Sequence, residues 1–186
     1  MSEPIHRVQS PKHLAWLDLE MTGLDASSDV ILQAALIVTD AELRPLEELA
    51  CDVWQPEAAL ANMTPFVRAM HEKTGLLARV RATQLELRDA EKQLLERLAG
   101  WCAFPAILCG NSIGNDRRFV DRWMPGFAAY LHYRMIDVSA LKVLAGLWWG
   151  EAAVYQKSED AKHDALNDVR LSIAELRHYR DTLMKK

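Results

Sequence analysis

The stretch His13-Leu-Ala-Trp-Leu-Asp-Leu-Glu20 is an apolar run that ends in two acids, Asp18 and Glu20. Such a run predicts a buried β-strand, in which successive side chains alternate between the two faces of a sheet. Asp18 and Glu20 therefore share one face, where two buried carboxylates repel each other. Converging oxygen ligands of this kind suit a hard divalent cation such as Mg²⁺ or Mn²⁺. Taken alone, so short a pattern is more typical of a strand end whose acids are solvated or paired with Lys or Arg.

Two other acidic positions lie far along the chain. Asp116 follows the loop 110–114 where a helix is expected to begin, a place that also favours an ordinary N-terminal helix acid. Farther on, His163 precedes Asp168 by five residues, a spacing that separates two side chains around a continuous helix. His163 is therefore predicted on a loop or first turn and Asp168 one turn in, so that both can face one pocket. Either residue, if it stood alone, would be interpreted as a solvated side chain.

The hydrophobic pattern predicts an α/β fold, a mixed central β-sheet flanked by helices. A turn at 40–45 joins the second and third strands, so the first three strands are predicted to form an antiparallel meander, and helices and strands then alternate. Ser139 is expected to cap the helix that ends near Trp149. One domain is predicted over 13–186, after an extension, 1–12, that is expected to be flexible. Strands are expected at 13–20, 30–39, 48–54, 106–109 and 135–138, and helices at 85–101, 117–124, 139–149 and 164–183.

Composition limits the partners and the cellular compartment that are expected for this chain. A net charge of −4 over 186 residues argues against a protein that grips long nucleic acid through a basic surface. The longest uncharged apolar runs are too short to span a bilayer, and the N-terminus lacks an apolar signal core, so no membrane partner is expected. Cys51, Cys102 and Cys109 lie in apolar surroundings without a Cys-x-x-Cys pair, which favours buried thiols in a reducing cytoplasm.

Together the acidic positions resemble the active site of the DEDDh 3′→5′ exonucleases. The match comprises Asp18 and Glu20 in a first strand, Asp116 in mid-chain, and His163 with Asp168 at the last helix. Longer segments are similar, in the same order, to those of the oligoribonuclease family. These segments are Trp16–Asp25, Cys109–Phe119, His132–Arg134, Asp137–Ser139, Ala174–Leu176 and Tyr179-Arg180. The resemblance implies an RNase H-like fold and release of 5′-mononucleotides from the 3′ end of RNA. It also implies that the four carboxylates hold two divalent ions, Mg²⁺ or Mn²⁺, while His163 acts as general base.

The same resemblance implies a homodimer that degrades very short, single-stranded, 5′-phosphorylated RNA, with dinucleotides favoured. Ser112 matches the family's phosphate contact, and Tyr133 and Arg134 match residues that reach the phosphate from the partner subunit. A guanidinium suits that task because it binds phosphate in a bidentate manner. Without the resemblance, Tyr133 and Arg134 would be interpreted as ordinary surface side chains.

Further family positions concern the bases. Leu24 matches an apolar wedge between two bases, and His71 matches a histidine on the phosphate side. Phe66 stands where the family usually has a stacking Trp, and Phe offers less stacking area. Two more departures are Gln33, where an acidic residue is expected, and Asn167, which replaces an acid beside Asp168.

Two rival functions remain open at this point. A DEDDh exonuclease could act on DNA or on the 3′ ends of longer RNA, although the acidic net charge and the lack of a basic tract argue against it. A catalytically silent nucleic-acid-binding module could keep the fold, but such a module would be expected to lack a carboxylate or the histidine, and all five residues are present.

Overall fold

The first three strands of the computed structural model, which describes residues 7–156 and 164–184, form the antiparallel meander that the sequence predicts. They are β1 (Leu14–Met21), β2 (Ile31–Thr39) and β3 (Pro45–Asp52). The last of these begins at Pro45, earlier than predicted, because the turn is tight. The carboxylate of Asp40 accepts hydrogen bonds from the backbone N–H groups of Glu42 and Arg44, at 2.9 Å each. Proline is tolerated at the first position of a strand.

Two parallel strands complete the sheet on the other side of β1. They are β4 (Ala106–Gly110) and β5 (Leu131–Asp137), and the strand order is β3-β2-β1-β4-β5. The edge strand β5 begins four residues before the predicted strand, so it includes His132, Tyr133 and Arg134. This mixed sheet confirms the predicted fold class.

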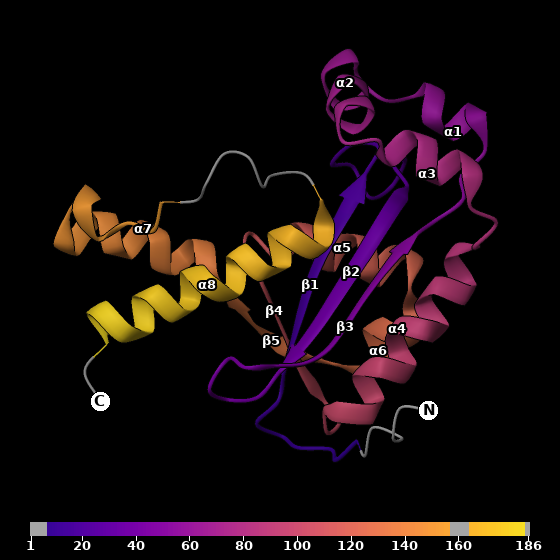
Figure 1. Cartoon of the computed structure of the whole chain (residues 1–186). Helices are drawn as coiled ribbons and strands as arrows, with labels where there is room; N and C mark the ends of the chain where they lie inside the picture. The colour runs from indigo at the N-terminus through magenta and orange to yellow at the C-terminus, as the bar shows by residue number, and fades with distance from the viewer. Residues whose placement is uncertain (1–6, 157–163, 185–186) are drawn as a thin grey trace, which may run out of the picture.

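Helices form most of the remaining structure (Figure 1). The short helices α1 (Glu57–Ala61), α2 (Pro65–Lys73) and α3 (Leu76–Ala82) gather over one end of the sheet, where Leu32 packs among their apolar side chains. The longer helices are α4 (Leu87–Trp101), α5 (Gly114–Trp123), α6 (Pro125–Tyr130), α7 (Val138–Trp149) and α8 (Ala165–Leu183), with a 3-10 turn η1 (Glu151–Ala153) after α7. No helix in the described part of the chain is long and apolar enough to cross a membrane.

Two details of the helices differ from the sequence prediction. The helix predicted over 117–124 ends as expected, since α5 stops at Trp123, but the sequence did not reveal that a further helix, α6, begins at Pro125. Proline suits a first helical position, and Glu91 of α4 accepts hydrogen bonds from the free N–H groups of Gly126 and Phe127 there. The cap of α7 is Asp137, whose side chain accepts from the N–H of Ser139 at 2.9 Å, rather than Ser139 itself.

Strand alternation divides the core into two layers. Ala15, Leu17 and Leu19 of β1 face the layer that contains α4, α5 and α6. Trp16 faces the opposite layer, where α7 and α8 cover the sheet. Because Asp18 and Glu20 follow the same alternation as Trp16, they point toward the side of α8.

Residues 7–12 of the expected extension lie against this domain. Arg7 forms an ion pair with Glu47 at 3.0 Å, and Ser10 pairs with Cys102 in an isolated bridge. The other part of that expected segment, residues 1–6, falls outside the described residues.

Candidate active site

Three carboxylates meet between β1 and the start of α8. Asp18, Glu20 and Asp168 each offer one oxygen atom, and these three oxygens lie within 4.8 Å of one another. Asp18 and Glu20 are brought together by strand alternation, and Asp168 comes from the first turn of α8. Three converging carboxylate oxygens on a partly buried surface are the donor set that a hard divalent cation requires.

Burial and electrostatic repulsion both act on the carboxylates of this cluster. Glu20 is 8% exposed, and burial, followed by the negative charges of Asp168, Asp116 and Asp164, raises its pKa from 4.5 to about 7. A bound cation would reverse this effect because it favours the ionised carboxylates. The residues present therefore fit a divalent metal ion.

Asp116 lies beside this cluster, in the first turn of α5. It is buried, and its Oδ1 accepts a hydrogen bond from the N–H of Leu19, between Asp18 and Glu20, at 2.9 Å. Burial, with a contribution from Asp137, raises the pKa of Asp116 to about 7. Among the described residues it is not one of the three whose oxygens meet, but its charge acts on Glu20.

His163, the predicted general base, lies outside the described residues. The described chain resumes at Asp164, whose side chain caps α8 by accepting from the N–H of Asn167 at 3.3 Å. The prediction that a helix begins here, with Asp168 one turn in, is confirmed.

The loop after β4 exposes Ser112 in an unusual backbone conformation. Its φ of +50° lies in the left-handed region, which a non-glycine residue adopts only where its surroundings enforce it. Here its N–H donates to the carboxylate of Asp137 and the hydroxyl of Ser139, at 2.9 and 2.8 Å. The preceding Asn111 donates to Glu175, a fully buried acid of α8, at 3.0 Å. The loop is therefore held to both β5 and α8.

A shallow groove of about 160 Å³ adjoins the acidic cluster, between β1 and α2. Leu24 at its rim is 68% exposed, and Phe66 at the start of α2 is 78% exposed, so both apolar side chains are available to a ligand. The groove is lined by Glu20, Met21, Gly23, Leu24, Val67 and Met70, among others.

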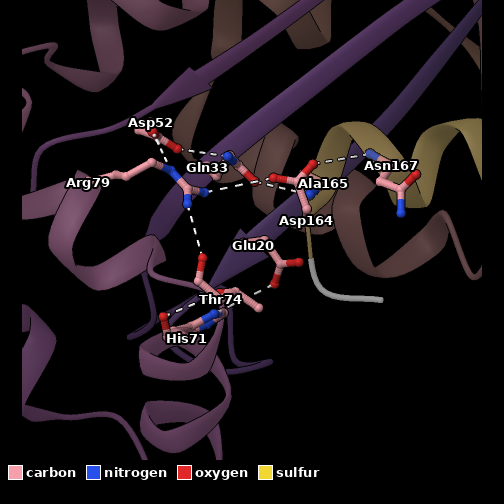
Figure 2. A network of polar contacts seen from close by, with 9 residues as sticks. All are labelled: Glu20, Gln33, Asp52, His71, Thr74, Arg79, Asp164, Ala165 and Asn167. Carbon is pink, nitrogen blue, oxygen red and sulfur yellow. Dashed lines mark hydrogen bonds and ion pairs between the residues drawn. The ribbon is translucent and has the colours of Figure 1, made fainter. Parts of the chain in front are cut away.

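His71 of α2 lies behind Glu20 and is fully buried (Figure 2). Its Nε2 lies 2.9 Å from the carbonyl oxygen of Met21, which can only accept, so Nε2 carries the hydrogen. Its Nδ1 lies 3.9 Å from Glu20 Oε2. In this position the ring contacts β1 and is shielded from solvent.

Tyr133 and Arg134 form an exposed cluster on β5. Tyr133 is 75% exposed and stacks on His132, and the guanidinium of Arg134 lies 5.2 Å from the Tyr133 ring centre. Arg134 precedes Asp137, the residue that holds Ser112, by three residues, which is about 10 Å along a strand.

Sequence patterns did not reveal one part of the surroundings, the contacts of Gln33 with Asp52 and with the backbone of Ala165 (Figure 2). Gln33 was noted only as a departure from an expected acid. The signal that could have found these contacts is strand register, since Glu20, Gln33 and Asp52 occupy one row across three strands.

Comparison with known proteins identifies the class. A family model described as Exonuclease (RNase_T) matches residues 15–176. The chain is 46% identical over 180 residues to the oligoribonucleases of Azoarcus sp. BH72 and Pseudomonas aeruginosa PAO1, with at least 95% of each chain covered. The oligoribonuclease of Ectopseudomonas mendocina is 45% identical over 181 residues, 96% of this chain and 99% of that one. These matches show that the chain belongs to the exonuclease family and, within it, to the oligoribonucleases.

Solved structures support the fold. The zinc-bound Escherichia coli exonuclease I–ssDNA complex aligns with a TM-score of 0.75 at 14% identity, over 94% of this chain and 41% of that one. Exonuclease I of Methylocaldum szegediense aligns with a TM-score of 0.64 at 20% identity, over 92% and 41%. The chain thus spans about two fifths of the length of these exonucleases. The sheet is that of the RNase H-like fold, as predicted.

Proposed function

We propose that this protein removes 5′-mononucleotides from the 3′ ends of very short, single-stranded RNA, and that dinucleotides are its favoured substrate. The observation that carries this proposal is the convergence of Asp18, Glu20 and Asp168 beside Asp116, in a chain whose curated relatives are oligoribonucleases. The buried acids bring negative charge to one point, and this arrangement suits cation-assisted phosphodiester hydrolysis.

The four carboxylates would hold two divalent ions, Mg²⁺ or Mn²⁺. When bound, such ions activate a water and stabilise the charge that develops on the phosphate oxygens. Asp18, Glu20 and Asp168 supply converging oxygens, and Asp116 fixes the strand by accepting the N–H of Leu19. We assign the general base to His163 from the family resemblance, because a histidine with an ordinary pKa can accept a proton near neutral pH.

We propose that the substrate lies along the groove beside the acids. Leu24 would separate the two bases, since it is exposed and lines the groove together with Glu20. Phe66, exposed one position before the groove residue Val67, would stack on one of the bases. Ser112 would contact the 5′ phosphate through its hydroxyl. His71 would support the site from behind Glu20, and its contact with Met21 would keep the end of β1 in place.

Tyr133 and Arg134 would complete the phosphate site from a second subunit of a homodimer. Both are exposed on an edge strand, set apart from Ser112 of the same chain. The helix that follows, α7, exposes Val143, Leu147, Trp148 and Trp149, between 53% and 73% each. An apolar surface of this kind is uncommon on a monomer and suits burial against a second copy of the chain.

A reducing cytoplasm suits the cysteines. Cys51, Cys102 and Cys109 are buried free thiols, and burial raises the pKa of Cys102 to about 12, so this thiol stays protonated and inert. We therefore propose that the enzyme works in the cytoplasm.

The test is release of mononucleotides from labelled dinucleotides and longer RNA and DNA oligomers. We expect 5′-mononucleotide product with Mg²⁺ or Mn²⁺, none after thorough chelation, and recovery when metal is returned. Asp18→Ala should abolish turnover while keeping the fold, because it removes a metal ligand from a cluster of repelling acids. Cleavage that persists under chelation would contradict the metal mechanism, and a preference for DNA would favour the rival exonuclease function.

A further inference from the structure

We propose that Gln33, Asp52 and Arg79 form a positioning network that sets the first turn of α8, and with it the carboxylate of Asp168, against Asp18 and Glu20. The residues act through the backbone of α8 and are positioning residues rather than catalytic ones. The proposal rests on the metal site of the proposed function, and it concerns how this chain builds that site.

The network begins with a row of side chains across three strands. Glu20 of β1 pairs with Gln33 of β2, and Gln33 pairs with Asp52 of β3. Directly opposed residues of antiparallel strands project to the same face of a sheet. Gln33 therefore stands between two acids on the side that α8 covers, and it is 4% exposed.

The side-chain amide of Gln33 donates one hydrogen bond and accepts another. Its Nε2 donates to Asp52 Oδ1 at 2.7 Å, and its Oε1 accepts from the N–H of Ala165 at 3.0 Å (Figure 2). A Glu in this place could accept from Ala165 but could not donate to Asp52, and the two carboxylates would repel each other. An amide at this position is thus the partner that Asp52 requires.

The N–H of Ala165 is the first of α8, one of the helix N-terminal groups that have no partner within the helix. Gln33 satisfies it from the sheet, three residues before Asp168. The backbone N–H of Asp168 in turn donates to the carbonyl oxygen of Asp164 at 2.9 Å. A shift of the first turn of α8 away from Gln33 would therefore carry Asp168 away from β1.

Arg79 ties this row to α2 and to the cap of α8. Its Nε donates to Asp52 Oδ2 at 2.9 Å, its Nη1 donates to the carbonyl of Thr74 at 3.2 Å, and its Nη2 lies 3.8 Å from Asp164 Oδ2. Both oxygens of Asp52 are thus used, one for Gln33 and one for Arg79 (Figure 2). The network joins β2, β3, α3 and α8 at the edge of the acidic cluster.

The first experiment measures Mn²⁺ binding to the substrate-free protein by calorimetry. Gln33→Met removes both hydrogen bonds without changing charge, and we expect it to weaken Mn²⁺ binding by about 10-fold, as is usual when residues that orient metal ligands are changed. The matched control is Gln55→Met, because the side chain of Gln55 donates to a β2 carbonyl, that of Ile31, and this hydrogen bond does not involve α8. This control should bind Mn²⁺ as the parent protein does.

The second experiment reverses the polarity of one hydrogen bond. Asp52→Asn alone offers one oxygen where Gln33 and Arg79 need two, so it should also weaken Mn²⁺ binding. In the double variant Gln33→Glu with Asp52→Asn, the side-chain amide at position 52 donates to the carboxylate at position 33. That carboxylate still accepts from the N–H of Ala165, and the amide oxygen at position 52 accepts from Arg79. Net charge equals that of the parent, and Mn²⁺ affinity should return.

The outcomes separate positioning from general stability. A purely structural network would lower the melting temperature in chelator but leave Mn²⁺ affinity unchanged in Gln33→Met, and that result would overturn the proposal. A double variant that binds Mn²⁺ no better than Asp52→Asn would overturn it as well. If the parent itself bound no Mn²⁺, the proposed metal site and this inference would both fail, whereas unaffected variants of a Mn²⁺-binding parent would refute the inference alone.

Discussion

Glu20 is the residue at which the demands of folding conflict with those of the proposed metal site. It lies in a buried strand, where an ionised carboxylate is costly, and it is surrounded by Asp168, Asp116 and Asp164. The fold keeps these acids together although each one raises the pKa of Glu20. Without a cation the cluster should therefore destabilise the folded protein at neutral pH.

This conflict predicts a pH dependence of stability in chelator. The folded pKa of Glu20, about 7, is above its ordinary value of 4.5, so the folded state binds the proton more tightly than the unfolded state between these values. The contribution of Glu20 to the free energy of unfolding should accordingly fall as pH rises through this window, by about 3 kcal/mol at most. Asp116, whose pKa is also raised to about 7, should add to the fall. Chemical denaturation at several pH values measures the fall. Glu20→Gln should remove the share of Glu20 and leave that of Asp116, so a variant with the parent's slope would contradict the assignment.

A second prediction at this scale concerns His163. As general base it should contribute to the rate and little to substrate affinity, so His163→Ala should lower kcat by about 10²–10⁴-fold with a small change in binding. Steady-state kinetics over a pH series measures both, and the variant should lose the acidic limb of the pH–rate profile. A near-normal kcat in His163→Ala would show that His163 is not the general base.

At the scale of elements, one side chain of α4 caps the start of α6. Glu91 Oε1 accepts from the N–H of Gly126 at 2.7 Å and from that of Phe127 at 3.0 Å, so a glutamate of one helix caps the next. These donors lie at the positive end of the helix dipole, which favours an anion.

Glu91→Ala should therefore lower the free energy of unfolding by about 1–2 kcal/mol. The matched control is Glu96→Ala, an exposed glutamate of the same helix, which should have little effect. Urea denaturation of the two variants makes the comparison. Equal effects would show that the cap contributes no more than an ordinary surface charge.

The elements also show what could be predicted from the chain. The alternating run that ends in Asp18 and Glu20 predicted β1 and its acidic face, because a period of two leaves no other choice of face. The sequence indicated where α5 ends but not that α6 begins at Pro125, because the side chain that caps α6, Glu91, lies on another helix, 35 positions before Gly126. The roles of Asp116 toward Leu19 and of Gln33 toward Ala165 depend on tertiary contacts for which local periodicity carries no signal.

On the scale of the whole molecule, the acidic cluster and the exposed pair Tyr133 and Arg134 belong to different parts of the surface. The cluster lies between β1 and α8, while the pair lies on the edge strand that leads into the apolar surface of α7. A homodimer would bring the pair of one subunit to the phosphate site of the other.

Mixed dimers provide the test of this arrangement. Asp18→Ala chains should be inactive, and Arg134→Ala chains should lose the preference for a 5′ phosphate because the guanidinium no longer binds it. After subunit exchange, the intact carboxylates of an Arg134→Ala chain receive the arginine of the Asp18→Ala partner, so activity on 5′-phosphorylated dinucleotides should recover. Exchange that is verified but restores no activity would contradict a clamp shared between subunits.

The central claim, a metal-dependent exoribonuclease for the shortest RNAs, is tested most directly by one series of rates. The substrates are 5′-phosphorylated RNAs from dinucleotide to decanucleotide, each cleaved by the parent protein with Mn²⁺ under the same conditions. We predict that the dinucleotide is cleaved fastest and that the rate falls with length, because a pocket closed at the 5′ phosphate accommodates two nucleotides. Equal rates on the dinucleotide and the decanucleotide would contradict this account.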